Sequence, residues 1–473
     1  MVYMDPDCTR KILFVTRFVI AVFIFVGGYD TSGFSKQLKD IDTVSLSLNE
    51  AIDLALRANR NLIQAGYGLR SQILSLQSSR SEFDLKINPL SQIGIADGQK
   101  SAGFGVDINK KFDVGVQASL KPEVERADDL YTGRAGVSLH IPLLRGLGKA
   151  VNLSNVYHSQ FSRRAAERSM HIARVNVVLE TVSAVYDIKK QSQLVELFEF
   201  QTTRLAGHAE TARIKERVGL ATPIDIYRAE IRLKDAEDSL ASARESVANV
   251  KDRLKLILAL PLEKEIHTTT PLAFEPIRMD PDEAVKVALS HRIELEQKAD
   301  DIQEAERQAG IAKHNLLPRL DLVVDYDRFD SANEFRESMG LSQDRWAIYL
   351  TSDTDWSRTQ EKLDYRQHFL NLKNVRLSLD QTQDEIARDV RRQLKALDKS
   401  YQRIQIRREQ LHQADGKRAL AIIKFNYGMT DNFDVIEAET ERQRAQVDLI
   451  STEIDYIVGT YRMRSVLGTL IER

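Results

Sequence analysis

The chain has one cysteine and few prolines. Cys8 is the only cysteine among 473 residues, so the chain beyond it has no thiol for a disulfide, a zinc site or nucleophilic catalysis. The ten prolines are bunched, with none between Pro142 and Pro223 and none after Pro318. Because proline is excluded from helix interiors, two very long uninterrupted helices are permitted.

The chain also lacks a strong charge and the usual catalytic motifs. The net charge is −2, which gives no basic field for nucleic acid. The nine histidines form no HExxH motif, and the GLGKA segment at 146–150 lacks the spacing of a phosphate loop. The sequence therefore predicts no enzyme, no catalytic residue, no metal, no cofactor and no nucleic-acid partner.

Long apolar runs are missing outside the N-terminus. There, Arg10, Lys11 and Arg17 lie around the run ILFVTRFVIAVFIFV, which small residues follow. This pattern predicts a secretory signal peptide over residues 1–28. The alternative is an uncleaved anchor, although about 15 apolar residues are few for a span of ~20. Beyond residue 28, a membrane crossing would need β-strands, since no apolar run reaches ~18 residues.

Two pairs of similar stretches indicate an internal duplication. LNEAIDLALRANRNLIQ from Leu48 recurs as PDEAVKVALSHRIELEQ from Pro281, and RVGLATPIDIYRAEIRLKDAE from Arg217 recurs as NYGMTDNFDVIEAETERQRAQ from Asn426. Each half is predicted to contain a helix, a β-hairpin and a long helical hairpin. The predicted boundaries are 45–260 for the first repeat (β-hairpin about 86–142, helical tip near 219–225), 261–280 for a linker, and 281–470 for the second repeat (β-hairpin about 319–353, helical tip near 428–434).

The helical pattern is unusually long. It continues from about 149 to 218 and from about 356 to 427, which at 1.5 Å per residue gives rods of roughly 100 Å. The second tract has a narrow, coiled-coil-like apolar seam rather than a broad globular face. Its residues are Ile386, Val390, Leu394, Leu397, Tyr401, Ile404 and Leu411. Such helices are expected to pack laterally against other long helices.

Alternating polar and apolar residues predict the strands. In RLDLVVDYDRF, Asp321, Asp325 and Asp327 alternate with apolar residues. This pattern fits a soluble sheet and equally a membrane barrel with a wet lumen. The three aspartates are expected to face a wet lumen or a solvated loop rather than to bind calcium. Residues 87–109 contain further strand-like pieces, which either extend a barrel strand or form a loop.

The repeated tips carry turn and cap residues. Gly219 and Gly428 are each placed to end a helix in the left-handed conformation. Thr222 is the predicted N-cap of the next helix in the first repeat, with Pro223 in its first turn. In the second repeat the cap is Thr430 or Asp431.

These features together resemble the TolC-type outer membrane efflux family. The similarity rests on the duplicated plan, the LxxAIxxAL opening, the GxxxxxDxxxA tips, PLLRGLG after a strand and the closing SVLGTL. It covers roughly residues 45–470. The resemblance implies a mainly α fold with a β-barrel portion: a homotrimer whose coiled-coil-like helices form a periplasmic α-barrel. Each protomer would add four strands to a twelve-stranded transmembrane β-barrel.

The resemblance also implies gate residues at the periplasmic entrance. Asp434 and Glu437 match acidic residues that ring the closed entrance in the family. Phe425 and Thr430 occupy positions where family members can carry a hydroxylated aromatic residue and an arginine that lock the entrance. The hydroxyl and the guanidinium are therefore both missing here, and Tyr427 and Arg217 are the candidates to substitute for them. The structural alternative for both acids is simple complementation of the helix dipole.

Six tip residues are the candidates for contact with a periplasmic adaptor (membrane fusion) protein. The alternative for the two glycines is a helix C-cap without a partner. The candidates are Gly219, Thr222, Pro223, Asp225, Gly428 and Met429.

The expected function is that of an exit duct. The resemblance implies an outer membrane channel of a tripartite efflux or type I secretion system, with most of the chain in the periplasm. An inner-membrane RND or ABC transporter would deliver the substrate and supply the energy. Two alternatives remain open from the sequence: a periplasmic adaptor, or a coiled-coil scaffold protein of the cell envelope.

Overall fold

The computed structural model describes residues 43–96, 99–219 and 221–471. The predicted signal peptide, residues 1–28, lies outside them. The chain divides into two units: a small one of residues 1–45 with 263–267, and a large one that holds the rest. In the described part of the small unit, β1 (Thr43–Leu46) pairs with β6 (Glu265–Thr268), and each strand reaches one residue into the large unit. The helices and the main sheet belong to the large unit.

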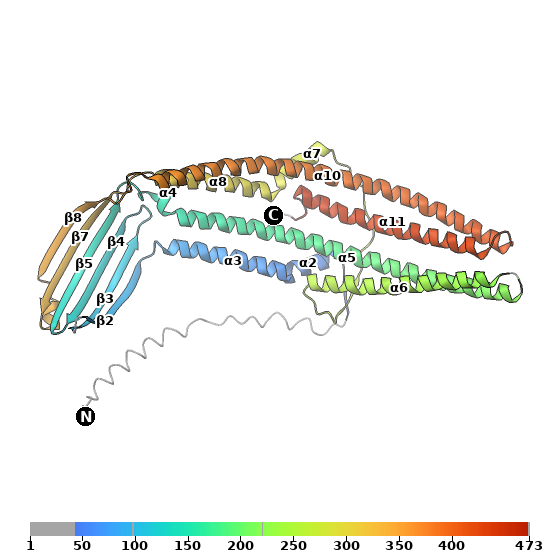
Figure 1. Cartoon of the computed structure of the whole chain (residues 1–473), viewed down its shortest axis with the longest axis horizontal. Coiled ribbons are helices and arrows are strands. Elements are labelled where there is room, and N and C mark those ends of the chain that lie inside the picture. The colour runs from blue at the N-terminus through green and yellow to red at the C-terminus, as the bar shows by residue number, and fades with distance from the viewer. Residues whose placement is uncertain (1–42, 97–98, 220, 472–473) are drawn as a thin grey trace, which may run out of the picture. The chain divides into compact units, whose positions relative to one another are not determined.

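The helices of the two halves follow the same order along the chain. In each half, two shorter helices precede the strands, and a helical hairpin follows them (Figure 1). The first half contains α2 (Leu48–Ala58), α3 (Arg60–Ser81), α4 (Lys149–Asn152), α5 (Ser154–Arg217) and α6 (Pro223–Ile257). The second half contains α7 (Pro281–His291), α8 (Ile293–His314), α9 (Phe335–Ser338), α10 (Thr359–Asn426) and α11 (Asn432–Leu467).

The two long helices have the predicted length. α5 has 64 residues and α10 has 68, so each is about 100 Å long. Four positions of the predicted seam are buried in α10: Ile386, Val390, Leu397 and Ile404. They pack in one cluster with Tyr456 of α11. The prediction of long helices with a narrow apolar seam is therefore confirmed. Within the described residues, every helix is too short or too polar to cross a bilayer.

A six-stranded antiparallel sheet follows the order β2-β3-β4-β5-β7-β8 (Figure 1). Its strands are β2 (Lys86–Ala96), β3 (Gln99–Lys111), β4 (Gln117–Ala127), β5 (Leu130–Pro142), β7 (Asp321–Ala332) and β8 (Gln343–Thr351).

The number of strands differs from the expectation. The sequence predicted one hairpin over about 86–142, whereas the structure places four strands there. The pieces at 87–109 are neither a loop nor an extension of a neighbouring strand but the separate strands β2 and β3. The chain thus supplies six strands instead of the four that the resemblance implied.

The sheet has one apolar and one polar face. A row of apolar residues crosses all six strands through directly paired positions: Ile87, Ile108, Leu120, Val137, Tyr326 and Trp346. Most of this row is exposed, up to 70 % for Trp346. The neighbouring row on the opposite face is mainly polar: Lys86, Asn109, Ser119, Ser138, Asp325 and Ala347. An exposed apolar face with a polar reverse is the pattern of a strand between lipid and a wet lumen.

The three aspartates of β7 lie on the polar face in hydrogen bonds and ion pairs. Asp327 lies 3.1 Å from Arg345 and 3.5 Å from Arg134. Asp325 accepts hydrogen bonds from the hydroxyls of Ser138 and Tyr349 at 2.5 and 2.7 Å. Asp321 pairs with Arg319 at 2.7 Å. Charged partners therefore bind Asp321 and Asp327, and hydroxyl donors bind Asp325.

Candidate functional site at the helical hairpin tips

The two hairpin tips share one backbone turn. Gly219 has φ +75° and Gly428 has φ +71°, and a Cβ atom at either position would meet open space. The amide of Gly219 donates to the carbonyl of Glu216 at 2.9 Å, and that of Gly428 to the carbonyl of Phe425 at 3.1 Å. Both glycines end their helices in the left-handed conformation, as predicted, because this conformation is strained for residues with a Cβ atom.

The first tip is closed by Thr222 and Asp225. The carboxylate of Asp225 accepts from the amide of Thr222 at 2.9 Å and from its hydroxyl at 2.7 Å. Pro223 is the first residue of α6. The pKa of Asp225 is lowered, first by the hydrogen bond from the Thr222 hydroxyl and then by that from the amide. The charged carboxylate therefore helps to fix the start of α6.

The second tip uses a different cap. Asp431 accepts from the amides of Phe433 and Asp434 at 3.0 and 3.3 Å. Of the two candidates that the sequence left open, the cap is therefore Asp431. Thr430 instead donates its hydroxyl to the carboxylate of Asp434. Thr430 thus holds a predicted gate residue in place.

Acidic residues form an exposed stripe on α11. Asp434 and Glu437 are exposed, whereas Val435 and Ile436 between them are buried. Glu441, one turn further on, continues the stripe and binds Lys417 at 2.8 Å. The pKa of Lys417 is raised, chiefly by this hydrogen bond and with contributions from Glu437 and Asp434. Only Asp434 and Glu437 were singled out from the sequence; the helical spacing of Glu441 could have added it.

A cation of the first hairpin stacks on an aromatic ring of the second. The ammonium of Lys215 lies 3.3 Å from the ring centroid of Phe425. The two predicted substitutes for the family's lock have other surroundings. Arg217 is 3.7 Å from Glu210 of its own helix, and the side chain of Tyr427 is 76 % exposed. The predicted lock position Phe425 therefore meets Lys215, which no local sequence signal marks as a site residue.

A second link between the hairpins lies further from the tips. Glu439 of α11 is 8 % exposed. It accepts from Arg204 of α5 at 2.8 and 3.1 Å and from Arg418 of α10 at 2.8 Å. His208 lies in the same region, and its pKa is lowered mainly by burial, with Arg204 and Arg418 lowering it further and Glu439 opposing. Three helices are thus joined through one carboxylate.

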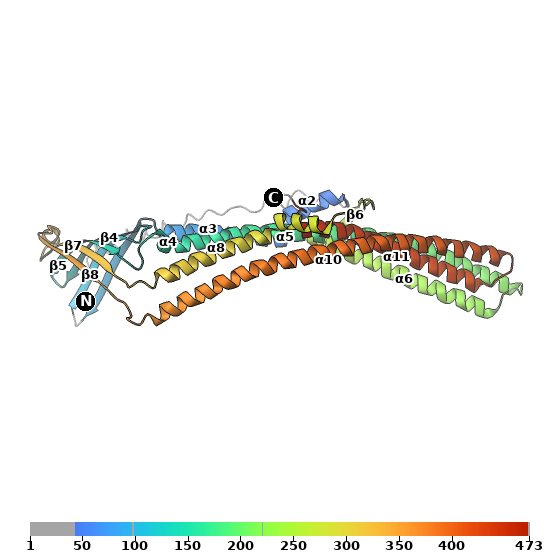
Figure 2. The same cartoon turned by 90° about the horizontal axis from the view of Figure 1, so that it is seen from above.

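Apolar contacts close the space between these polar links. Leu205, Ala209 and Ala229 of the first hairpin pack with Ile436 of α11. The small alanines allow the helices to approach closely. The hairpins lie side by side in both views (Figures 1 and 2).

A cavity of ≈720 Å³ lies between the two tips. Its lining includes five of the predicted site residues and the cap residue Asp431; the five are Asp225, Phe425, Gly428, Met429 and Thr430. Lys215 also lines it. The structure therefore brings residues of both predicted groups, gate and adaptor contact, to one groove. Gly219, Thr222 and Pro223 lie at the first tip outside this lining, and Asp434 and Glu437 lie on α11 beyond it.

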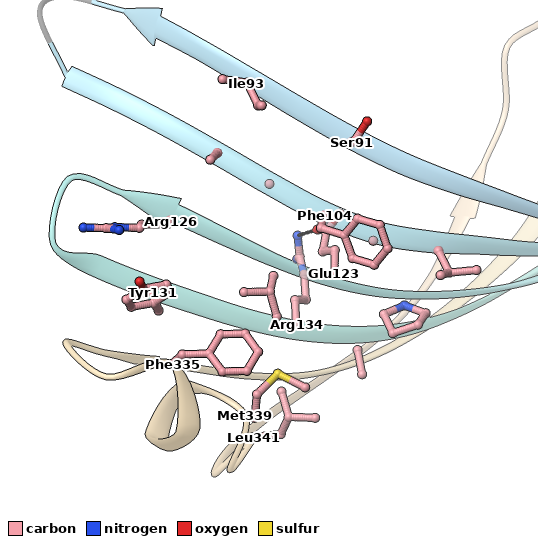
Figure 3. Close-up of a pocket in the computed structure, with 17 residues that line it drawn as sticks. Ser91, Ile93, Phe104, Glu123, Arg126, Tyr131, Arg134, Phe335, Met339 and Leu341 are labelled. Carbon is pink, nitrogen blue, oxygen red and sulfur yellow. Dashed lines mark ion pairs between the residues drawn. The ribbon is translucent and has the colours of Figure 1, made fainter. Parts of the chain in front are cut away.

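Another cavity, of ≈630 Å³, lies in the sheet (Figure 3). Phe335 and Met339, from the connection between β7 and β8, lie along strand β5, and Phe335 meets the ring of Tyr131 at 6.0 Å between centroids. The ion pair of Arg134 and Glu123 also lines it, at 4.0 Å. This cavity contains none of the predicted entrance residues.

The fold matches solved outer membrane channels. The VceC outer membrane protein of Vibrio cholerae superposes with a TM-score of 0.70 at 15 % identity, covering 89 % of this chain and 96 % of that one. The CmeC outer membrane channel of Campylobacter jejuni gives a TM-score of 0.70 at 15 % identity, covering 90 % and 86 %. The fold class is therefore that of TolC-type channels, with long helices and a β-barrel portion, as predicted.

Sequence comparison agrees with the fold. Residues 284–469 match the family described as outer membrane efflux protein. The outer membrane efflux protein BepC of Brucella suis is 20 % identical over 339 residues, which cover 72 % of this chain and 73 % of BepC. The resemblance to the outer membrane efflux family is confirmed by sequence for residues 284–469, and the shared fold covers most of the chain.

Proposed function

We propose that three copies of this chain form an exit duct in the bacterial outer membrane, with most of each chain in the periplasm. Substrates would pass from an inner-membrane transporter through the helical tunnel to the outside. The observation that carries this proposal is the pairing of a fold shared with outer membrane channels with an exposed acidic stripe on α11. Relatives named as outer membrane efflux proteins support it.

The acidic stripe supports a role at the periplasmic entrance. Asp434 and Glu437 point away from the packing of their own chain, since the residues between them are buried. Three copies around an axis would place six carboxylates in a narrow opening. Rings of acidic side chains favour cations and repel anions. Thr430 would keep the carboxylate of Asp434 fixed in this ring.

The contacts between the hairpins support a closed entrance. Lys215 on Phe425 and Arg204 on Glu439 both join the first hairpin to the second. We infer that these contacts do the work of the family's lock. Opening would require the second hairpin to move away from the first, which breaks both.

The tip groove supports a contact with a periplasmic adaptor protein. Asp225, Gly428 and Met429 line it, while Gly219, Thr222 and Pro223 surround the first tip. An adaptor that bound here could report the state of the transporter to the lock. The adaptor would belong to an RND efflux system or to an ABC-driven system, including type I secretion.

The same proposal gives a role to each segment of the chain. Residues 1–28 would direct secretion, 45–260 and 281–470 would be the two repeats, and 261–280 would link them. The duct would catalyse no reaction and need no cofactor. Its outer surface would meet lipid.

Ion selectivity tests the entrance assignment. Replacing both Asp434 and Glu437 with alanine is expected to leave the trimer intact and to weaken cation selectivity and divalent-cation block in planar bilayers. The matched control is Asp235→Ala with Asp238→Ala, which removes the same charge from α6 of the first hairpin and is expected to leave selectivity as it is. Unchanged selectivity in the first variant would refute the gate assignment.

A further inference from the structure

The sheet of one chain ends in two strands with an unpaired side. β2 pairs only with β3 and β8 only with β7 in the described part of the chain. Unpaired strand edges are templates for pairing with another chain. We propose that β8 of one copy pairs with β2 of the next, so that three copies close a cylinder of eighteen strands rather than twelve. This inference rests on the proposed trimeric duct.

Strand direction permits this closure. The six strands alternate in direction across the sheet, so β2 and β8 run in opposite directions. Placing β8 of one copy beside β2 of the next therefore continues the antiparallel order without a fault. The strands are also similar in length, with 11 residues in β2 and 9 in β8.

The two faces of the sheet also continue across the proposed junction. At the edges, Ile87 of β2 and Trp346 of β8 end the apolar row, and both are exposed. Lys86 and Ala347 end the neighbouring row on the polar face. A one-residue slip would turn the side chains of one strand to the wrong face. Joining like faces therefore gives an unbroken apolar exterior.

The hairpin of β2 and β3, which supplies the two strands beyond the expected four, is hydrogen-bonded into the sheet. β3 pairs with β4 from Ser101 to Lys111, with an interruption opposite Pro122. Gly105 fits this junction closely, because a Cβ atom there would lie 2.9 Å from both the Cβ of Glu123 and the carbonyl oxygen of Pro122. β4 therefore has both sides occupied, by β3 and β5, and has no free edge for a neighbouring copy.

The additional strands would widen the outer membrane pore. With strands ~4.8 Å apart and tilted by ~40°, a twelve-stranded cylinder has a backbone diameter of about 24 Å and an eighteen-stranded one of about 36 Å. The cross-section within the backbone roughly doubles. The duct would thus offer its cargo a wider exit than a twelve-stranded channel.

Disulfide trapping tests the junction. The only native cysteine is Cys8, in the predicted leader, so introduced pairs have little background. One set joins β2 to β8 on the polar face, with Lys86→Cys, Asn88→Cys or Gln92→Cys each combined with Ala347→Cys or Thr351→Cys. The control set joins β4 to β8, with Ser119→Cys or Lys121→Cys combined with the same β8 positions.

Closure by eighteen strands joins β8 to the neighbour's β2, whereas closure by twelve strands would join β8 to the neighbour's β4. The two arrangements predict opposite results for trimers in outer membranes. Eighteen strands predict that β2–β8 pairs yield covalent dimers and trimers on non-reducing gels and that β4–β8 pairs yield none. In such a sheet β4 lies three strand spacings, ~14 Å, from the neighbour's β8, beyond disulfide reach. Products from β4–β8 pairs, or from neither set, would overturn the inference.

A point variant provides a second test. Gly105→Val is expected to separate β3 from β4 and to reduce the β2–β8 product, while Gly103→Ala, whose nearest contact is 3.6 Å, keeps it. A full β2–β8 product in Gly105→Val would contradict the tight β3–β4 junction. Native mass and the disulfide products together separate the two proposals. A monomer by native mass refutes the duct itself. A trimer whose disulfides form through β4 refutes only the eighteen-stranded closure.

Discussion

Glu230 and Glu439 occupy equivalent positions in the two repeats but have different surroundings. Glu230 lies on α6, is partly exposed and pairs with Arg213 of its own hairpin at 2.5 Å. Glu439 lies on α11, is buried and binds Arg204 and Arg418 from both hairpins. The same residue thus stabilises one hairpin in the first repeat and joins two hairpins in the second.

The difference follows from what covers each helix. α11 packs against α10 and also, through Ile436, against the first hairpin. α6 presents more of its surface to the outside, with Tyr227 and Ile231 exposed. The two hairpins have similar sequences at their tips, but packing gives Glu439 of α11 the connecting role. Changes to α11 should therefore matter more than the equivalent changes to α6.

The largest expected effect comes from breaking the buried link. Glu439→Gln leaves Arg204 and Arg418 beside an uncharged amide. Removing one partner of a buried ion pair lowers the free energy of unfolding by about 3–5 kcal/mol. The matched Glu230→Gln should cost at most about 1 kcal/mol, since its pair is exposed. Thermal unfolding of the detergent-solubilised trimer measures both. Equal losses would contradict the proposed difference between the repeats.

The second largest effect on stability is expected from substitutions in the glycine turns at the two hairpin tips. Gly219→Val and Gly428→Val each place a branched side chain in the left-handed conformation, at a cost of roughly 1–2 kcal/mol. Gly207→Ala and Gly416→Ala are the controls, because these glycines lie inside helices with open space around them. The two alanine controls should raise the free energy of unfolding by up to about 1 kcal/mol. We also expect the valine variants to impair cross-linking to an adaptor; undiminished cross-linking would argue against that contact.

The link at the tips should have a smaller effect on stability than on conduction. Phe425→Leu removes the aromatic face from Lys215 and should cost about 0.5–1 kcal/mol. If this contact helps to hold the entrance closed, conductance in planar bilayers should rise. Phe433→Leu is the matched control. Arg228 lies 5.7 Å from the Phe433 ring centroid, a longer and weaker contact than that of Lys215 with Phe425. A conductance that rises equally in both variants would show that the effect is not specific to the lock.

The smallest expected effect is a pH dependence around the buried link. Burial lowers the pKa of His208 in the folded chain, so the unfolded chain takes up a proton more readily. Stability contributed by the neutral imidazole is complete above the unfolded pKa and is lost as the pH falls below about 6.5. His208→Gln should flatten this part of the stability profile. An unchanged slope would assign the pH dependence to other groups.

The sequence predicted the long helices and the turn at each tip because these depend on local signals. Helical periodicity, the scarcity of proline, and Gly219 and Gly428 were sufficient. The pairing of Arg204 with Glu439 could not be predicted, since the two lie 235 positions apart and no local pattern records which helices meet. Phe425 was singled out, but its partner Lys215 depends on the same long-range packing.

The strands show a different limit. Alternation at β5, β7 and β8 was clear, whereas β2 and β3 contain Pro89, Gly94, Gly103 and Gly105. Proline and glycine weaken a strand pattern, which left residues 87–109 open. In the structure Gly105 lies where β3 closely approaches β4, whereas a Cβ atom at Gly94 or Gly103 would meet its nearest neighbour at 3.7 or 3.6 Å. At Gly105, the residue that weakened the strand pattern is therefore a feature of tight strand packing.

Single-channel recording of the intact protein tests the central claim most directly. Material extracted from outer membranes should run as a trimer by native mass and produce uniform, cation-selective conductance steps in a planar bilayer. A monomer that remains in solution without detergent and produces no steps would contradict the account.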